Sequence, residues 1–215
     1  MKNLSVYILG LITVGMFSFG CENAVQVDEE ADNKTDTTSV SSEDHKAEEL
    51  KIAEPEHAKV KEIRIELMAA SNSDASGTIA FRERAGQVSM EAKLKGLNAG
   101  THAIHLHENA NCSSDDGKSA GGHWNPTNEQ HGKWGDAEGY HKGDIGNFEV
   151  SEDGKATVTF ETSEWCIGCD DEAKNIVGRS VIIHQGKDDF ISQPSGDAGK
   201  RIGCAEITDG LVNIK

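Results

Sequence analysis

The chain has 215 residues and a formal net charge of −16, from 37 acidic and 21 basic side chains. This balance excludes nucleic-acid binding through bulk charge, because such binding needs a basic surface. Apolar residues make up 36% of the chain and aromatic residues 5%, so we do not expect all of it to fold. No run of 18 apolar residues follows the first twenty, and the sequence therefore predicts no internal membrane helix.

The N-terminus has the pattern of an export signal. A lysine precedes an apolar stretch, residues 4–19, that is too short for a stable membrane span. The stretch ends at Gly20 and Cys21, and a small residue followed by cysteine resembles the signal of a bacterial lipoprotein, whose cysteine is lipidated after cleavage. We predict a signal peptide over residues 1–20, a lipid on Cys21, and an exported protein anchored in the periplasm or cell envelope. An ordinary secretory leader is the alternative, since Ser18 replaces the usual aliphatic residue.

An acidic segment follows the leader. Residues 22–62 carry 13 acidic and 5 basic side chains and only scattered apolar residues. Such a segment cannot bury enough apolar surface to offset the entropy lost on ordering it. We therefore predict a disordered tether over residues 21–60, between the lipid anchor and a folded domain over residues 61–215.

The remainder of the chain alternates apolar and polar residues with the period of β-strands. Ile63, Ile65 and Leu67, for example, alternate with charged residues, and glycines mark turns between such stretches. Many short strands without long helical segments predict an all-β sandwich or barrel. The predicted strands cover residues 61–67, 77–85, 87–94, 101–107, 146–150, 155–162, 179–184 and 201–207.

The cysteine count agrees with export. Without Cys21 the chain has an even set of four cysteines, and an even set in an exported protein indicates two disulfides. The four are Cys112, Cys166, Cys169 and Cys204.

Histidines gather in and beside a stretch without strand pattern, residues 109–143. A loop of this length on a compact domain is usually either functional or disordered, and neutral imidazole is the commonest metal ligand. Two of the histidines, His105 and His107, lie two apart on a predicted strand, so their rings point to the same side while Leu106 points into the core. The seven histidines of this region are residues 102, 105, 107, 123, 131, 141 and 184.

Two sets of four ligands can be formed from these residues and one carboxylate. Three nitrogens and one oxygen fit tetrahedral zinc, and His123, His131, His141 and Asp144 supply them. Four nitrogens suit copper(II), and His105, His107, His123 and His184 supply them. Two sets of four from seven residues require one shared ligand, for which His123 is the natural candidate.

Six motifs along residues 61–211 together resemble the copper–zinc superoxide dismutases, and the spacing from His107 to Cys112 is similar to that of the bacterial branch. The resemblance implies an all-β fold, an eight-stranded Greek-key β-barrel (an immunoglobulin-like sandwich) with long metal-binding and electrostatic loops. The motifs are HLHENxxC (105–112), GGHWNP (121–126), His131, HxGDxGN (141–147), GRSxIIH (178–184) and GxAGxRxxC (196–204).

The resemblance also assigns roles to single residues. It implies one copper and one zinc per subunit, held by the two sets above and bridged by His123. Asp188 falls where the family has an aspartate that links ligands of the two metals, although the adjacent Asp189 is a second candidate. Cys112 and Cys204 would form a disulfide that pins the long loop to the barrel.

The implied reaction is the dismutation of superoxide anion to dioxygen and hydrogen peroxide, which would protect the cell envelope. Arg201 matches an arginine beside copper and would orient the anionic substrate with a permanent charge. Residues 63–215 carry 24 acidic and 15 basic side chains. Their net negative charge would repel superoxide at long range, so a local positive surface must attract it. Lys187 and Lys200 are candidates for it, or else solvated surface lysines. The protein would contact the membrane only through its lipid anchor. The sequence does not decide whether the protein forms a homodimer.

The sequence departs from the family pattern in several places. His131 and His141 lie ten residues apart, one more than the usual spacing, and Asp197 replaces an asparagine near Arg201. Cys166 and Cys169 form a CxxC without counterpart in better-known members, which we interpret as a surface disulfide, with a metal-handling pair and reactive thiols as alternatives. We assign a structural role to His102.

Two other function classes are compatible with metal binding. A non-catalytic copper- and zinc-binding envelope lipoprotein is the alternative to an enzyme, but the residues that catalysis needs are all present. A zinc hydrolase needs an open coordination position, which the four-ligand zinc set does not leave.

Overall fold

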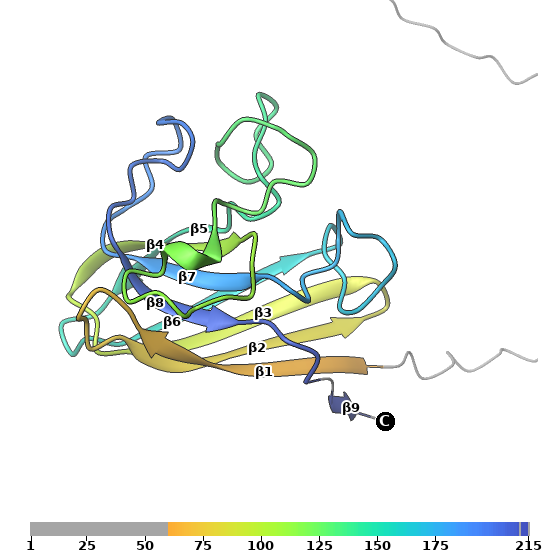
Figure 1. The fold of residues 1–215 in the computed structure, drawn as a ribbon, viewed down its shortest axis with the longest axis horizontal. Coiled ribbons are helices and arrows are strands. Elements are labelled where there is room, and N and C mark those ends of the chain that lie inside the picture. Colours follow the sequence, from red (N-terminus) through yellow and green to blue (C-terminus); the bar gives the residue numbers. More distant parts are fainter. Residues whose placement is uncertain (1–59, 211, 215) are drawn as a thin grey trace, which may run out of the picture. The chain divides into compact units, whose positions relative to one another are not determined.

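The computed structural model describes residues 60–210 and 212–214, the last three by their backbone alone (Figure 1). The predicted signal peptide, the predicted lipidation at Cys21, the predicted tether up to residue 59, and the histidines at 45 and 57 lie outside the described residues. Within the described part of the chain, no helix is long and apolar enough to cross a membrane.

Eight antiparallel strands form a nearly closed barrel, so the all-β, eight-stranded prediction is confirmed. No predicted strand boundary is wrong by more than two residues. A ninth strand, β9 (Val212–Ile214), pairs with β1 and was not predicted. The eight barrel strands are β1 (Val60–Ala69), β2 (Ser76–Arg84), β3 (Gln87–Lys95), β4 (Gly100–His107), β5 (Gly146–Val150), β6 (Ala156–Thr162), β7 (Ser180–His184) and β8 (Arg201–Glu206).

The strand order brings together segments that are far apart in sequence. The hydrogen-bonded order is β5-β4-β7-β8-β1-β2-β3-β6, in which β4 pairs with β7 and β3 with β6 across Greek-key connections. In the β4–β7 pair, His105 lies opposite Ile182, and in the β7–β8 pair His184 lies opposite Arg201. The topology therefore places β4, β7 and β8, with three of the candidate ligand histidines and Arg201, side by side.

Side-chain burial alternates along most strands of the barrel but not along β4, β7 and β8. On β3, buried apolar residues alternate with more exposed polar ones, as expected for a strand with one face in the core and one in water. All five residues of β7 and the last six of β4 are buried, because loops cover their outer faces. Leu106 points into the core as predicted, and His105 and His107, with no exposed surface, lie beneath the covering loops.

Two long loops rise from the same side of the barrel (Figure 1). The β4–β5 loop, residues 108–145, contains a short 3-10 helix, η1 (Lys118–Ala120), which the sequence did not predict. The β7–β8 loop covers residues 185–200. Backbone hydrogen bonds tie the first of these loops to β4, from Leu106 N–H to Gly143 O (2.9 Å) and from Trp124 N–H to Leu106 O (2.8 Å). Gly143 is required there, because a Cβ atom would collide with the Leu106 carbonyl.

Candidate metal centre

Four buried histidines meet where β4, β7 and the β4–β5 loop converge. One ring nitrogen from each lies within 4.8 Å of the corresponding nitrogen of every other. Two come from adjacent outward positions on β4, one from the end of β7 and one from the loop. The four are His105, His107, His123 and His184, the set that the sequence analysis assigned to copper.

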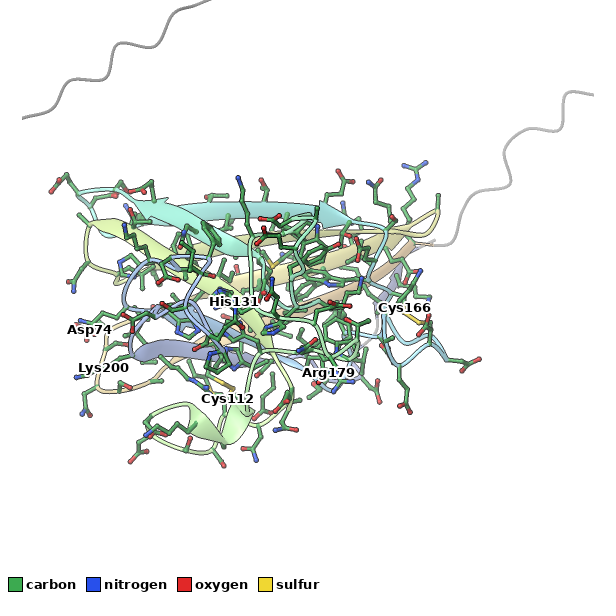
Figure 2. The ribbon with its side chains drawn as sticks, turned by 90° about the horizontal axis from the view of Figure 1, so that it is seen from above. Asp74, Cys112, His131, Cys166, Arg179 and Lys200 are labelled. Atoms are coloured by element: carbon green, nitrogen blue, oxygen red, sulfur yellow. A yellow bond between two sulfur atoms is a disulfide. The ribbon has the colours of Figure 1, made fainter. Side chains whose placement is uncertain are left out.

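A second buried group shares one of these histidines. One ligand atom from each of its four residues again lies within 4.8 Å of the others. Its members are those of the set assigned to zinc, His123, His131, His141 and Asp144. The shared residue is His123, whose ring centroid lies 4.1 Å from that of His105 and 5.3 Å from that of His131. Figure 2 shows His131 within this cluster of rings.

The unpartnered ring nitrogens of these histidines converge on two points. Within the described residues, the following buried nitrogens lack a hydrogen-bond partner: Nδ1 of His105, His131 and His141, and Nε2 of His107, His123 and His184. A buried polar atom without a partner costs stability, so six such atoms in two groups need an explanation. Metal ions would satisfy all six, and both donor sets therefore fit the metals that the sequence analysis assigned to them.

The opposite ring nitrogens of four histidines have a hydrogen-bond partner, which fixes ring orientation and tautomer; that of His184, Nδ1, lies 3.5 Å from the Gly199 carbonyl oxygen. His107 Nδ1 lies 3.0 Å from the Gly121 carbonyl oxygen. His105 Nε2 and His131 Nε2 each lie 2.9 Å from a different oxygen of the Asp188 carboxylate. Asp188 thus connects one histidine of each set. Asp189 instead accepts hydrogen bonds from the backbone of residues 191 and 192.

Close backbone packing preserves the Asp188 bridge. Gly196 has φ +67°, and a Cβ atom on it would collide with the Asp188 carboxylate and the His131 ring. A glycine both adopts this conformation and leaves the space open. We therefore expect any side chain at position 196 to displace the carboxylate that connects the two sets.

The electrostatics keep three histidines of the copper set neutral at neutral pH. Burial lowers the pKa of His107 and of His184 well below the ordinary value, and nearby positive charges lower them further. Burial and His105 lower the pKa of His123 to about 4, against the opposing effect of Asp144. These three imidazoles keep free lone pairs at pH 7, which is the form that binds metal ions.

The zinc set is organised around an ionised carboxylate. Burial alone would raise the pKa of Asp144, but a hydrogen bond with His123 and close contacts with His131 and His141 hold it well below its ordinary value. Burial would likewise lower the pKa of His131, yet its contacts with Asp144 and Asp188 raise it to about 9. Metal binding at His131 Nδ1 would therefore displace a proton.

Arg201 lies beside the copper set. It is half-buried, opposite His184 in the β7–β8 pair, and it donates a hydrogen bond from Nη1 to the Gly117 carbonyl (2.9 Å). Burial lowers its pKa, and Asp116 and Glu108 oppose that effect. Its positive charge also lowers the pKa of His107 and His184, as expected for a cation facing them.

The other charged residues singled out from the sequence lie at the surface. Lys187, Lys200 and Asp197 are all exposed. Asp197 has φ +49°, a left-handed conformation that asparagine and aspartate tolerate better than most residues. Two carboxylates that were not predicted to belong to the site, Asp116 and Glu108, are the negative charges that act on Arg201.

His102 lies outside both metal sets. Its Nδ1 is 2.8 Å from the His184 carbonyl oxygen and its Nε2 is 2.9 Å from that of Asn98. The buried ring also stacks on Phe148, with 5.9 Å between the ring centroids. His102 thus joins the end of β7 to the turn before β4.

Both cysteine pairs are disulfides. Cys112–Cys204 joins the β4–β5 loop to β8 across 92 residues, with 5.8 Å between the Cα atoms. Cys166–Cys169 closes a tight turn in the β6–β7 loop, residues 163–179. Cys166 and Lys200 lie at opposite ends of the barrel in Figure 2.

Two side-chain amides hold the backbone of site residues, a role that was not predicted from the sequence. Gln193 accepts a hydrogen bond from His131 N–H (2.9 Å) and donates one to the His131 carbonyl (2.8 Å). Asn147 does the same for Asp188, at 2.7 and 2.8 Å. Asn147 is the last residue of the motif HxGDxGN (141–147), and this position was a usable signal for its role. Nothing in the sequence pointed to Gln193.

Comparison with known proteins identifies relatives of this chain. The sequence model of the family described as copper/zinc superoxide dismutase (SODC) matches residues 75–207. Among solved structures, a SOD-like protein from Bacillus subtilis is 30% identical, with a TM-score of 0.60 over 67% of this chain and 97% of that one. A double mutant described as a SOD-like protein from the same organism is also 30% identical, with a TM-score of 0.61 over 67% of this chain and 96% of that one.

Proposed function

This chain belongs to the copper/zinc superoxide dismutase family, and we propose that it dismutates superoxide to dioxygen and hydrogen peroxide. The observation that carries the proposal is the set of six unpartnered, buried imidazole nitrogens arranged in two groups around His123. Arg201 beside one of these groups supports a reaction with a small anion rather than metal storage alone.

The two donor sets would hold different metals. Copper would be held by His105 through Nδ1 and by the other three histidines of its set through Nε2. Zinc would be held by Nδ1 of His123, His131 and His141 and by the Asp144 carboxylate. Bound copper supplies one-electron redox chemistry, whereas zinc has no redox chemistry of its own and orders the site.

The protein's own residues would bind substrate and move protons. Arg201 would orient superoxide with a guanidinium that keeps its charge at any physiological pH. While its Nε2 is not bound to copper, His123 would hold a proton on that nitrogen and deliver it to the developing peroxide. Two superoxide anions and two protons then give one dioxygen and one hydrogen peroxide. The burial of both sets beneath the loops excludes bulk water from the ring nitrogens.

We expect the purified chain, reconstituted with copper and zinc, to dismutate superoxide rapidly and His184→Ala to lose copper and activity. His184 supplies one of four copper donors and belongs only to that set, so zinc should remain bound. Superoxide decay is the measurement, and Gln185→Ala, at the exposed neighbouring position, is the matched control.

Binding of both metals without dismutation would contradict the proposal. That outcome would favour the non-catalytic copper- and zinc-binding envelope protein instead.

A second expectation concerns Arg201. Arg201→Ala should lower kcat/KM for superoxide by about 10- to 100-fold, because a hydrogen bond to a charged group contributes roughly 1.5–3 kcal/mol. Arg201→Lys should recover part of the loss, since it restores charge but not the planar donor geometry. The measurement is the rate of superoxide decay after a pulse of superoxide, for the wild type and both variants at equal copper content. Equal rates for all three proteins would exclude Arg201 from substrate binding.

We further propose that the protein works outside the cytoplasm, anchored by a lipid on Cys21, where it protects the cell envelope against superoxide. The leader sequence supports this proposal, as do the two disulfides, which persist in oxidising compartments. Radiolabelled-lipid incorporation that disappears in Cys21→Ser would test the anchor. Unlabelled wild-type protein in the soluble fraction would argue for a plain secretory leader.

A further inference from the structure

The β6–β7 loop contacts the residues on both sides of His141. Glu164 accepts a hydrogen bond from Tyr140 Oη (2.7 Å) and forms an ion pair with Lys142 Nζ. The next residue, Trp165, donates from Nε1 to the Lys142 carbonyl (2.8 Å). Two consecutive residues of one loop therefore hold both chain neighbours of a zinc-set histidine.

Aromatic packing supports the same segment. Trp134, which lies between His131 and His141 in sequence, packs against Tyr140 with 4.9 Å between ring centroids. It also meets Phe160 edge-on at 4.8 Å and Trp165 at 5.9 Å. Because aromatic pairs contribute beyond their buried area, this cluster fixes the β4–β5 loop against β6 and the β6–β7 loop.

The contacting residues are themselves fixed to the barrel. Trp165 and Ile167 are fully buried. Ile167 N–H donates to a Glu83 carboxylate oxygen (2.8 Å), and the Ile167 carbonyl accepts from Lys61 Nζ (2.7 Å). The Cys166–Cys169 disulfide closes the turn around Ile167. Glu164 and Trp165 thus project from a rigid base rather than from a free loop.

We propose that Glu164 and Trp165 are positioning residues for zinc, which keep His141 Nδ1 directed toward the other zinc donors. His141 Nδ1 is 3.3 Å from Asp144 Oδ1, close to the geometry it needs. Removing a group that orients a metal ligand typically weakens metal binding 10- to 100-fold. The copper set contains none of the residues that this pair contacts, so copper binding should be spared. The proposal rests on the proposed function in that it takes the second set to bind zinc.

The test measures zinc and copper dissociation constants separately, by competition with chromophoric chelators on the metal-free full chain. Glu164→Gln keeps the size of the side chain but removes its charge, and Trp165→Phe keeps the ring but removes the indole N–H. We expect each to weaken zinc binding about 10-fold and to change copper binding less than twofold. The control is Glu161→Gln, the same chemical change at an exposed position of β6, which should change neither constant.

A spectroscopic measurement separates positioning from general destabilisation. Cobalt(II), used as a probe in the zinc site, should show an altered visible spectrum in Glu164→Gln but not in Glu161→Gln. Unchanged zinc constants in both test variants, or equal losses of zinc and copper, would overturn the proposal. If the unsubstituted chain binds no zinc, the metal assignment of the proposed function fails first, and that result is distinguishable from a failure of the two variants.

Discussion

His123→Ala is expected to lose both copper and zinc, whereas His107→Ala loses only copper and His131→Ala only zinc. The reason is the position of the His123 ring between the two sets. Its Nδ1 lies 2.8 Å from the Asp144 carboxylate of the zinc set, and its Nε2 is the nitrogen that faces the copper set. The other two histidines each belong to one set only.

The size of the effect follows from the number of donors removed. Loss of a residue that merely orients a ligand costs up to about 100-fold in metal affinity, and loss of a ligand itself should cost at least that much. His123→Ala should therefore weaken both metals by about 100-fold or more and reduce dismutation to background. The measurement is the metal-to-protein ratio after equilibrium dialysis, determined by elemental analysis for each of the three variants.

The comparison among the three variants controls for misfolding. A variant that had merely unfolded would lose both metals whichever histidine was replaced, so His107→Ala and His131→Ala must each retain one metal. Gln130→Ala, an exposed neighbour of His131, should retain both. Retention of zinc at the wild-type ratio by His123→Ala would show that the ring is not shared between the metals.

The barrel could be predicted from the sequence because its physical basis is local. Alternation along each strand determines which side chains enter the core, and glycines mark where strands end. β9 has only three residues, too few for alternation to be visible. The 3-10 helix η1 likewise leaves no periodic pattern over its three residues.

The two donor sets could be listed from the sequence, but their support could not. The choice between Asp188 and Asp189 depends on which of two adjacent side chains turns inward, and composition does not determine this. Gln193 and His131 are 62 residues apart, and Trp165 is 23 residues from Lys142. Such contacts arise from packing between loops, which leaves no periodicity for a sequence analysis to detect.

The two disulfides are expected to stabilise the metal-free protein very unequally. In the chain-entropy description, a cross-link stabilises by restricting the unfolded chain, and the effect grows with the length of the closed loop. Cys112–Cys204 spans 92 residues and Cys166–Cys169 only 3. Replacing the first pair by serine should therefore lower the free energy of unfolding by about 4–5 kcal/mol, against roughly 2 kcal/mol for the second.

Equilibrium urea unfolding of both double-serine variants, without metals, provides the measurement. Equal losses would mean that native contacts around the cysteines, rather than loop length, determine the stabilisation. The larger loss should also reach the site, because the Cys112–Cys204 bond fixes the part of the β4–β5 loop that leads to Gly117, whose carbonyl accepts the hydrogen bond from Arg201. Cys112→Ser/Cys204→Ser, once saturated with copper and zinc, should therefore retain its metals but dismutate superoxide more slowly, with the loss in the step that depends on Arg201.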